Sequence, residues 1–455
     1  MTTALIIYLI VLILIAIRSA RRVKDIPDFF VARKGASAKA VAGSLVATIL
    51  GGSAVIGAVD SGATLGGAAS WFMLTGALGL LALIPFASRA YSHAKYALPD
   101  LVENLYGRGP RLVASIVIPV AWTGIVAAQI IAAAKLLMTF SPLDYTTAAV
   151  ISATVFTGYT LAGGQLSILR TDFMQACLII LGLLLVAGFA LFSGESFGGA
   201  APSLSAILSG APAFPFNTNF SPLDLFLLIL TYGTTYTAGP DIFSRMFCAK
   251  DVKTAKKAIA GAACTLIPIA FVIGFLAVYG VSLGNVQGAR ITAIANAVLP
   301  PAFIPLFALA LLSVVLSSAD TTLLSSSVIL CGLLGIGNDK NRSLAKARVI
   351  IFLNGIVALL LALVFTDIIG TLLLALAVYA GAFTVPILWG LLGLKAKPKF
   401  VGAAIMVGGI LALAGKLCPT GTLGSHTGDI LMIAAFAMNA IILALGRDSK
   451  FSDSV

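Results

Sequence analysis

The sequence predicts an all-α integral membrane protein with about 13 transmembrane helices, a 5+5 inverted-repeat core with two broken helices, and an N-out/C-in orientation. Three observations support this class. The composition is 60% hydrophobic and only 10% charged, whereas soluble domains carry about 25% charged residues. Apolar runs of about 20 residues, long enough to cross a bilayer, recur along the whole chain. Glycine and proline interrupt two of these runs, and both residues weaken a helix.

The apolar runs define the predicted spans, in chain order. They lie at approximately residues 3–18, 38–62, 67–92, 110–139, 143–162, 171–193, 222–246, 254–283, 301–334, 343–365, 368–394, 398–416 and 427–446. The first run lacks a basic segment before it and a small-residue cleavage motif after it, so we expect a retained span and not a cleaved signal peptide. The cysteines are scattered without a C-x-x-C pair, which argues against a disulfide or metal framework.

Basic residues predict the orientation, because Lys and Arg are retained on the cytoplasmic side. With the N-terminus outside, all of the 29 Lys and Arg residues fall on the inner side except Lys135, Arg290 and Lys416. The loop 194–221 contains neither Lys nor Arg and is expected outside. Topology therefore explains the net charge of +12, and we expect no nucleic-acid partner.

The spans predict five parts of the chain. Residues 1–36 form the first transmembrane helix and a cytoplasmic linker, 37–193 the first five-helix repeat, 194–221 an external loop, 222–394 the second five-helix repeat, and 395–455 two C-terminal helices with a short cytoplasmic tail.

The two broken spans read "GSLVATILGGSAVIG" (43–57) and "TYGTTYTAGPD" (231–241). They lie five spans apart, so equivalent segments cross the membrane in opposite directions. This arrangement fits an inverted repeat, in which secondary transporters bind solutes near the membrane midplane. The alternative is that the small residues only allow helices to pack closely.

The ninth predicted span carries an unusual density of hydroxyls and one carboxylate, in "LLSVVLSSADTTLLSSSVIL" (311–330). A single Ser or Thr can bond back to its own helix. Asp320 is different, because a carboxylate costs about 2.5 to 3.5 kcal/mol at the centre of a membrane helix on insertion scales. It must face protein, water or a cation, and hydroxyl and carbonyl oxygens suit a hard cation such as sodium.

Several stretches together resemble the sodium:solute symporter family, which includes sodium–glucose, sodium–proline and choline transporters. Residues 159–175, "YTLAGGQLSILRTDFMQ", resemble the family signature Y-x-x-x-G-G-x-x-x-x-x-x-T-D-x-x-Q. The other stretches resemble core helices: 43–57 the broken first, "AQIIAAAKLL" (128–137) the third, "GPDIFSRMFCAKDVKTAKKA" (239–258) the end of the sixth, and "SSADTTLLSSS" (317–327) the eighth. Order and spacing agree over roughly residues 30–395.

The resemblance implies a sodium site made of two carbonyls of the first core helix with one carbonyl and two hydroxyls of the eighth. The positions are Ala47, Leu50, Val314, Ser317 and Ser318. It also implies a second sodium site or a proton position at Asp172, Asp320 and Thr321. Asp320 could share a proton with Asp172, because two neighbouring carboxylates do not both ionise readily.

The resemblance places solute between the two breaks. The candidate residues are Thr48, Gly52, Ser53, Trp71, Phe72, Tyr236 and Tyr379. Ser53 and Ala54 stand where sugar-binding relatives carry a carboxylate and an amide, which disfavours a sugar. Ile49 stands where the choline branch has an aromatic residue for cation–π contact, which disfavours choline. A small amino acid or organic acid is preferred.

Two further carboxylates lie near the broken spans. For Asp60 the expectation is divided between lining an outer vestibule and interfacial solvation. Asp241 precedes Ser244 and Arg245, and we expect it to pair with cytoplasmic cations.

The predicted function is sodium-coupled symport of a small organic solute by alternating access, in the cell (plasma or inner) membrane. The expected partners are the solute, the sodium ion (Na+) and the lipid bilayer, with no obligatory protein partner. The alternatives are proton coupling through Asp172 and Asp320, an ion channel, and a transporter-like receptor domain. The receptor alternative is disfavoured because the sequence shows no signalling module. An enzyme is not expected, because no nucleophile–base set or metal cluster is evident.

Overall fold

The computed structural model describes residues 2–93, 96–196, 214–284, 286, 288–336, 343–365, 368–418 and 427–447. Most of these residues are helical, and within them β-pairing is limited to isolated bridges such as Ala36 with Ala249. The predicted all-α class is therefore confirmed. Of the predicted external loop 194–221, residues 197–213 lie outside the described part.

The elements are α1 (Thr2–Ala20), α2 (Ile26–Val31), η1 (Ala32–Lys34), α3 (Ala38–Ile49), η2 (Ser53–Gly57), α4 (Ala58–Asp60), α5 (Gly62–Leu65), η3 (Gly66–Ala69), α6 (Ser70–Leu83), α7 (Ala87–His93), α8 (Leu98–Tyr106), α9 (Arg108–Phe140), α10 (Tyr145–Ser196), α12 (Pro222–Leu228), η4 (Ile229–Gly233), α13 (Thr234–Ala238), α14 (Pro240–Met246), α15 (Val252–Val281), α16 (Arg290–Val298), η5 (Pro301–Phe303), α17 (Ile304–Leu333), α18 (Ser343–Val364), α19 (Ile368–Leu391), α20 (Pro398–Leu417) and α21 (Thr427–Leu445).

Each predicted span corresponds to a helical stretch, and several spans are divided into shorter elements. The element α10 covers two predicted spans, 143–162 and 171–193, as two helical stretches that meet at a kink at Gly164 (φ 54°, ψ −150°). Among the described residues, 9 helices are long and apolar enough to cross a membrane, or up to 10 if the bent pair formed by 38–49 and 54–60 is one span. The number of crossings and the orientation remain predictions.

Both predicted breaks are present. The axes of Ala38–Ile49 and Ala54–Asp60 differ by 56°, and Leu50 between them has non-helical backbone angles (φ −75°, ψ 49°). The second break is at Gly239, which is extended (φ −72°, ψ 139°) between α13 and α14. Pro240 begins α14, where its missing amide hydrogen breaks no helical bond. Each broken span also contains a π-helical segment, η2 in the first and η4 in the second.

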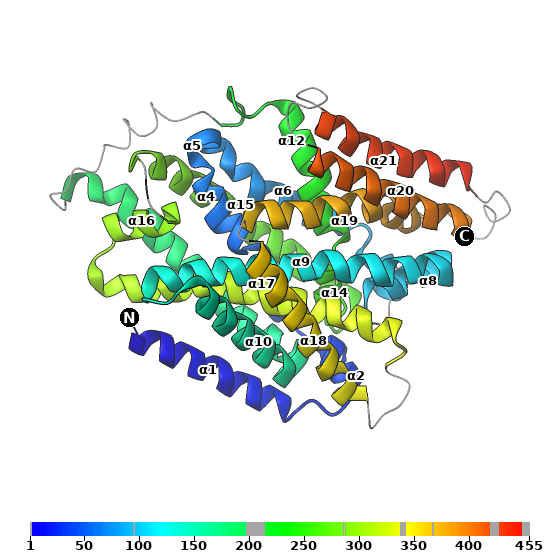
Figure 1. Cartoon of the computed structure of the whole chain (residues 1–455), viewed down its shortest axis with the longest axis horizontal. Helices are drawn as coiled ribbons and strands as arrows, with labels where there is room; N and C mark the ends of the chain where they lie inside the picture. Colours follow the sequence, from blue (N-terminus) through cyan, green and yellow to red (C-terminus); the bar gives the residue numbers. More distant parts are fainter. Residues whose placement is uncertain are drawn as a thin grey trace.

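Helix α17 lies in the interior of the molecule, where it packs mainly against α9 and α10 and also contacts α3 and α18. α1 lies on one flank beside α10, and α20 and α21 lie on the opposite flank (Figure 1). Every residue from Ser313 to Ile329 is buried. The many hydroxyls of α17 therefore face protein and not lipid, which removes most of the penalty that polar groups meet in a bilayer.

A polar contact also joins α1 to this interior. The Tyr8 hydroxyl lies 2.7 Å from Ser313 Oγ on α17, and Gln175 Nε2 of α10 donates to the same tyrosine oxygen at 3.2 Å.

The outward faces of the molecule expose large apolar side chains such as Val120, Phe192 and Leu360. Such faces suit contact with lipid, so the surface and the interior both agree with a membrane protein.

Candidate functional site

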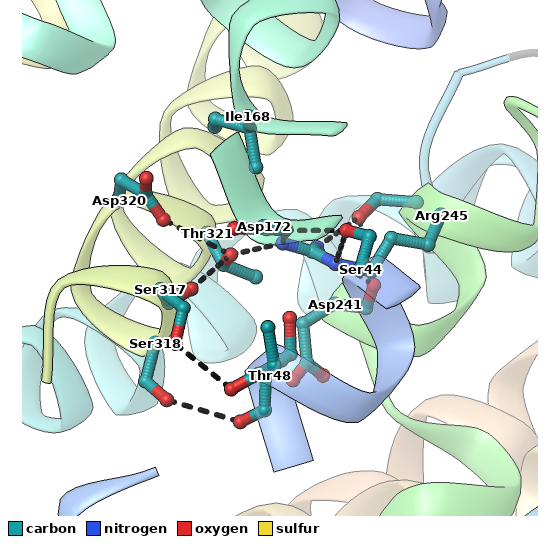
Figure 2. A network of polar contacts seen from close by, with 12 residues as sticks. Ser44, Thr48, Ile168, Asp172, Asp241, Arg245, Ser317, Ser318, Asp320 and Thr321 are labelled. Atoms are coloured by element: carbon teal, nitrogen blue, oxygen red, sulfur yellow. Dashed lines mark hydrogen bonds and ion pairs between the residues drawn. The ribbon is translucent and has the colours of Figure 1, made fainter. Parts of the chain in front are cut away.

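The serine hydroxyls of α17 contact α3 at the first break. Ser317 Oγ donates to the Ala47 carbonyl oxygen at 2.8 Å, and Ser318 Oγ donates to the Thr48 carbonyl oxygen at 3.0 Å (Figure 2). These carbonyls are available because α3 ends at Ile49, and the last carbonyls of a helix have no amide partner within it. The break therefore provides acceptors that the serines bind.

Four of the five residues of the predicted sodium site take part in this junction. Besides Ala47, Ser317 Oγ reaches the Val314 carbonyl oxygen at 3.3 Å. Leu50 lies at the bend, and its amide donates to the Val46 carbonyl oxygen at 2.9 Å. The oxygen atoms that would coordinate the ion are neutral and come from two helices, and such a set fits a sodium ion. Binding of sodium at this junction stays a prediction.

Gly51 allows this close approach of α3 and α17. A Cβ atom on Gly51 would lie 2.5 Å from Ser318 Oγ, a separation that real carbon atoms do not adopt. Gly51→Ala should therefore separate the two helices and lower the free energy of unfolding by about 1–3 kcal/mol. Sodium-induced thermal stabilisation of the purified protein should fall with it.

The matched control for this substitution is Gly261→Ala on α15. There the added Cβ would lie 3.9 Å from Ala42 Cβ, an ordinary contact. Equal stability and equal sodium response of both variants would contradict the role given to Gly51.

A second polar cluster lies beside the first and is centred on Arg245, whose side chain is fully buried. Nε donates to Ser44 Oγ at 3.0 Å, and Nη1 donates to the Asp241 carbonyl oxygen at 3.1 Å and to Ser244 Oγ at 3.2 Å. Nη2 lies 3.5 Å from Asp172 Oδ2 and also donates to Thr321 Oγ1. Ser44 Oγ in turn donates to Asp172 Oδ2.

Arg245 thus lies among the residues of the predicted second cation site. Thr321 and Asp172 contact its guanidinium, and Thr321 Oγ1 lies 3.2 Å from Asp320 Oδ1. The other carboxylate oxygens, Asp172 Oδ1 and Asp320 Oδ2, have no hydrogen-bond partner in the described part of the chain. The three predicted residues therefore lie together, with a positive group of the protein between two of them.

The expectation for Asp241 was wrong. Arg245 forms its ion pair with Asp172, and it contacts only the backbone carbonyl of Asp241. The reason is the helix break at Gly239: α14 starts at the next residue, which directs the Asp241 side chain toward the interior beside Thr48 (Figure 2). Asp60 lies elsewhere, and its Oδ1 accepts from the Arg290 amide at 2.7 Å.

The charges of this interior do not balance. Among the described residues of the membrane-spanning helices, the buried ionisable acids and bases are Asp172, Asp241 and Asp320 against one base, Arg245. Three carboxylates facing one guanidinium leave an excess of two negative charges when all are ionised. Uncompensated buried charge is strongly unfavourable. The interior therefore requires positive charge from ions, protons or a cationic ligand.

A cavity of about 50 Å³ lies between the two breaks. Its lining residues are Thr48, Ile49, Gly51, Trp122, Ile125, Gln129, Thr235, Tyr236, Asp241, Ser318, Thr322, Leu372 and Leu376.

Two of the predicted solute residues, Thr48 and Tyr236, line this cavity. Tyr379 lies behind it, with its ring 4.5 Å from the ring of Trp122 and its hydroxyl donating to the Ala238 carbonyl oxygen at 2.5 Å. Gly52 faces Gln129, since its Cβ would lie 3.3 Å from Gln129 Oε1.

Like Gly52 and Tyr379, the predicted residues Phe72 and Trp71 are not among the lining residues. Phe72 packs edge-on against Tyr232, with ring centroids 6.0 Å apart. Trp71 lies toward the external loop, where its Nε1 donates to the Pro215 carbonyl oxygen at 3.0 Å. The side chain of Ser53 lies outside the described part of the structure.

Sequence reasoning missed several lining residues, among them Trp122, Gln129 and Thr322. Gln129 had a usable signal, because it is the one amide within the apolar stretch "AQIIAAAKLL". Ser44 and Arg245 were also missed as site residues. Arg245 stands at the start of a basic stretch that continues to Lys257, so the sequence groups it with the cytoplasmic cations.

Comparison with known proteins agrees with the family resemblance found in the sequence. The profile of the sodium:solute symporter family matches residues 29–409. A sodium/proline symporter of Haemophilus influenzae is 30% identical over 245 residues, which cover 50% of this chain and 46% of that protein. A high-affinity proline transporter of Bacillus subtilis is 26% identical over 257 residues, 54% of each chain. The chain thus spans about half the length of the curated relatives it matches.

Solved structures share the fold. A substrate-bound, outward-open Na+-coupled sialic acid symporter superposes with a TM-score of 0.78 at 18% identity, covering 98% of each chain. A nucleobase-cation-symport-1 family transporter in a closed conformation superposes with a TM-score of 0.56 at 15% identity, covering 92% of this chain and 94% of the other. At these identities the likeness concerns the fold alone.

Proposed function

The chain belongs to the sodium:solute symporter family, and on this premise we propose that it couples the inward flow of sodium to the symport of a small organic solute. Members of this family are transporters and not enzymes, and the protein is a multi-pass membrane protein. The curated relatives that it matches carry the names of proline transporters. We therefore propose a solute of similar size and type, a small amino acid.

The observation that carries this proposal is the junction between α3 and α17. Ser317 and Ser318 reach from an enclosed helix to the carbonyls that the first break leaves free. A sodium ion at this junction would take Ala47, Leu50, Val314, Ser317 and Ser318 as ligands. The hydroxyls, which donate to the carbonyls here, would turn a lone pair toward the ion instead.

Sodium at the junction would hold the first and eighth core helices together. Inward opening separates these helices and would release the ion past Asp172. An ion can shift such an equilibrium only by its difference in affinity for the two states. A site divided between two helices provides that difference, because its ligands converge only while the helices touch. The repeats 37–193 and 222–394 are the proposed moving units.

A second candidate is proton coupling through Asp172 and Asp320. The observation that favours it is the pair of unpartnered oxygens, Asp172 Oδ1 and Asp320 Oδ2, both buried. A proton would satisfy one of them as well as a metal cation would.

Uptake into proteoliposomes distinguishes the two. Radiolabelled proline, offered with a panel of other amino acids, should accumulate when an inward sodium gradient is imposed and not when lithium or protons replace sodium. Uptake that follows the pH gradient and ignores sodium would overturn sodium coupling and support the pair of carboxylates. Protein-free liposomes are the control.

A further inference from the structure

Three oxygen atoms of residues that line the cavity between the breaks have no hydrogen-bond partner among the described residues. Thr48 Oγ1, Gln129 Oε1 and Asp241 Oδ1 all line it, and each is buried without a hydrogen bond in the described part of the chain. Buried polar atoms without partners are rare in native proteins, and each needs an explanation. Three that share one cavity of about 50 Å³ make it a polar site, in which a ligand can provide the missing partners.

Asp241 sets the charge of that ligand. Its residue is only 9% exposed, and the nearby guanidinium of Arg245 is bound to Ser44, Ser244, Thr321, Asp172 and the Asp241 backbone. No side-chain cation pairs with the Asp241 carboxylate among the described residues. The glycine at the break leaves room for it, because a Cβ on Gly239 would lie 2.9 Å from Asp241 Oδ1.

The remaining walls set the shape and polarity of the ligand. Ile49, Ile125, Leu372 and Leu376 make one side apolar, which suits a short aliphatic body. Trp122 and Tyr236 add aromatic rings, whose faces attract cations. Among the described lining residues there is no Lys, Arg or His to meet an anion.

We infer that the transported solute binds through a protonated amine, which donates to Asp241 Oδ1 with Gln129 Oε1 and Thr48 Oγ1 as further acceptors. Its aliphatic part packs against the isoleucines and leucines. This inference deepens the proposed function and rests on it, because it names the chemical class of the solute for the same cavity. An organic acid without an amine would meet the Asp241 carboxylate and be repelled. A cavity of about 50 Å³ holds only a few water molecules, so solute binding must widen it.

Binding to the purified full-length protein in detergent tests the inference. Three probes share a five-membered ring: proline carries an amine and a carboxylate, pyrrolidine carries only the amine, and cyclopentanecarboxylate carries only the carboxylate. A panel of other amino acids and simple amines is tested beside them. Compounds with a protonated amine should stabilise the protein against heat, whereas cyclopentanecarboxylate should not. Comparison of the stabilisation by pyrrolidine with that by proline shows whether the site prefers simple amines or amino acids.

The variant Asp241→Asn keeps the size of the side chain and removes its charge. It should weaken amine binding on the order of tenfold to a hundredfold, because the ammonium then donates to a neutral amide oxygen and no longer to a buried carboxylate. The matched control is Asp60→Asn, whose carboxylate caps the Arg290 amide outside the cavity and which should leave amine binding unchanged. Thermal stabilisation of each variant by sodium chloride, measured without amine, shows whether the variant is folded and whether its sodium site is intact.

Three results would overturn the inference: binding of cyclopentanecarboxylate as tight as that of the amines, full amine affinity in Asp241→Asn, or no stabilisation by any amine in the panel. The proposed function can fail separately, since sodium coupling is read from the gradient experiment. Sodium-coupled uptake that is indifferent to Asp241 would leave the symporter proposal standing and reject the amine site.

Discussion

Replacing Ser317 and Ser318 together with alanine is expected to weaken sodium binding by about a hundredfold or more, because each lost oxygen ligand costs about 1–3 kcal/mol and about 1.4 kcal/mol corresponds to tenfold in affinity. Both hydroxyls are buried and bind carbonyls across a helix junction. Their loss removes two of the five proposed ligands and leaves the Ala47 and Thr48 carbonyls without partners. Sodium dependence of proteoliposome uptake, and thermal stabilisation by sodium chloride against potassium chloride, measure the effect.

The matched control removes two other hydroxyls from the same helix. Ser326 and Ser327 accept from Asn354 Nδ2 of α18, at 2.6 and 3.2 Å. The double variant Ser326→Ala with Ser327→Ala should therefore lose some stability and keep the sodium response. A sodium response that is unchanged in the Ser317/Ser318 variant would show that the ion binds elsewhere.

Arg245→Gln should lower the free energy of unfolding by about 3–5 kcal/mol, the usual effect of removing one partner of a buried ion pair. Arg245 is fully buried and donates to groups on four helices, α3, α10, α14 and α17. Its removal also leaves Asp172, Asp241 and Asp320 without a buried positive side chain beside them in the described part of the chain. Thermal unfolding in detergent measures the change.

The second variant in this test is Asp172→Asn with Arg245→Gln, which removes both charges of the pair. It should be more stable than Arg245→Gln alone, because one uncompensated carboxylate is gone. The surface control is Arg33→Gln. The Arg33 side chain is 61% exposed and pairs with Asp25 and Asp28, and its guanidinium lowers the pKa of the Asp28 carboxyl. Because this guanidinium is in contact with solvent, its ion pairs contribute only about 0–1 kcal/mol each. A loss in Arg245→Gln no larger than in this control would contradict the central role of Arg245.

The spans and both breaks could be predicted from sequence because their causes are local. Apolar length defines a span, and Gly239 with Pro240 interrupts a helix wherever it lies. The pairing of Ser317 with Ala47 is different, since it joins residues on separate helices. The family resemblance supplied that pairing, and the hydroxyl pattern alone did not.

Arg245 and Asp241 show where sequence reasoning stops. Both stand at the end of an apolar run that leads into a basic segment, which is the pattern of a cytoplasmic boundary. Their burial depends on how α14 turns inward after the extended Gly239, and therefore on the packing of α3, α10 and α17 around it. By contrast, the kink at Gly164 lies between the predicted spans 143–162 and 171–193, so this boundary could be predicted from sequence.

The excess of carboxylates over guanidinium in the interior also has an electrical consequence. Moving one elementary charge through the whole membrane field changes its energy by about 2.3 kcal/mol per 100 mV. With its three carboxylates ionised the interior carries two excess negative charges when empty, and a bound sodium ion reduces this excess, so the empty form senses the field more strongly than the loaded form. With the cell interior negative, the voltage drives these negative groups toward the outside. The resting potential would then favour return of the empty carrier to its outward-facing state and act more weakly on the loaded carrier.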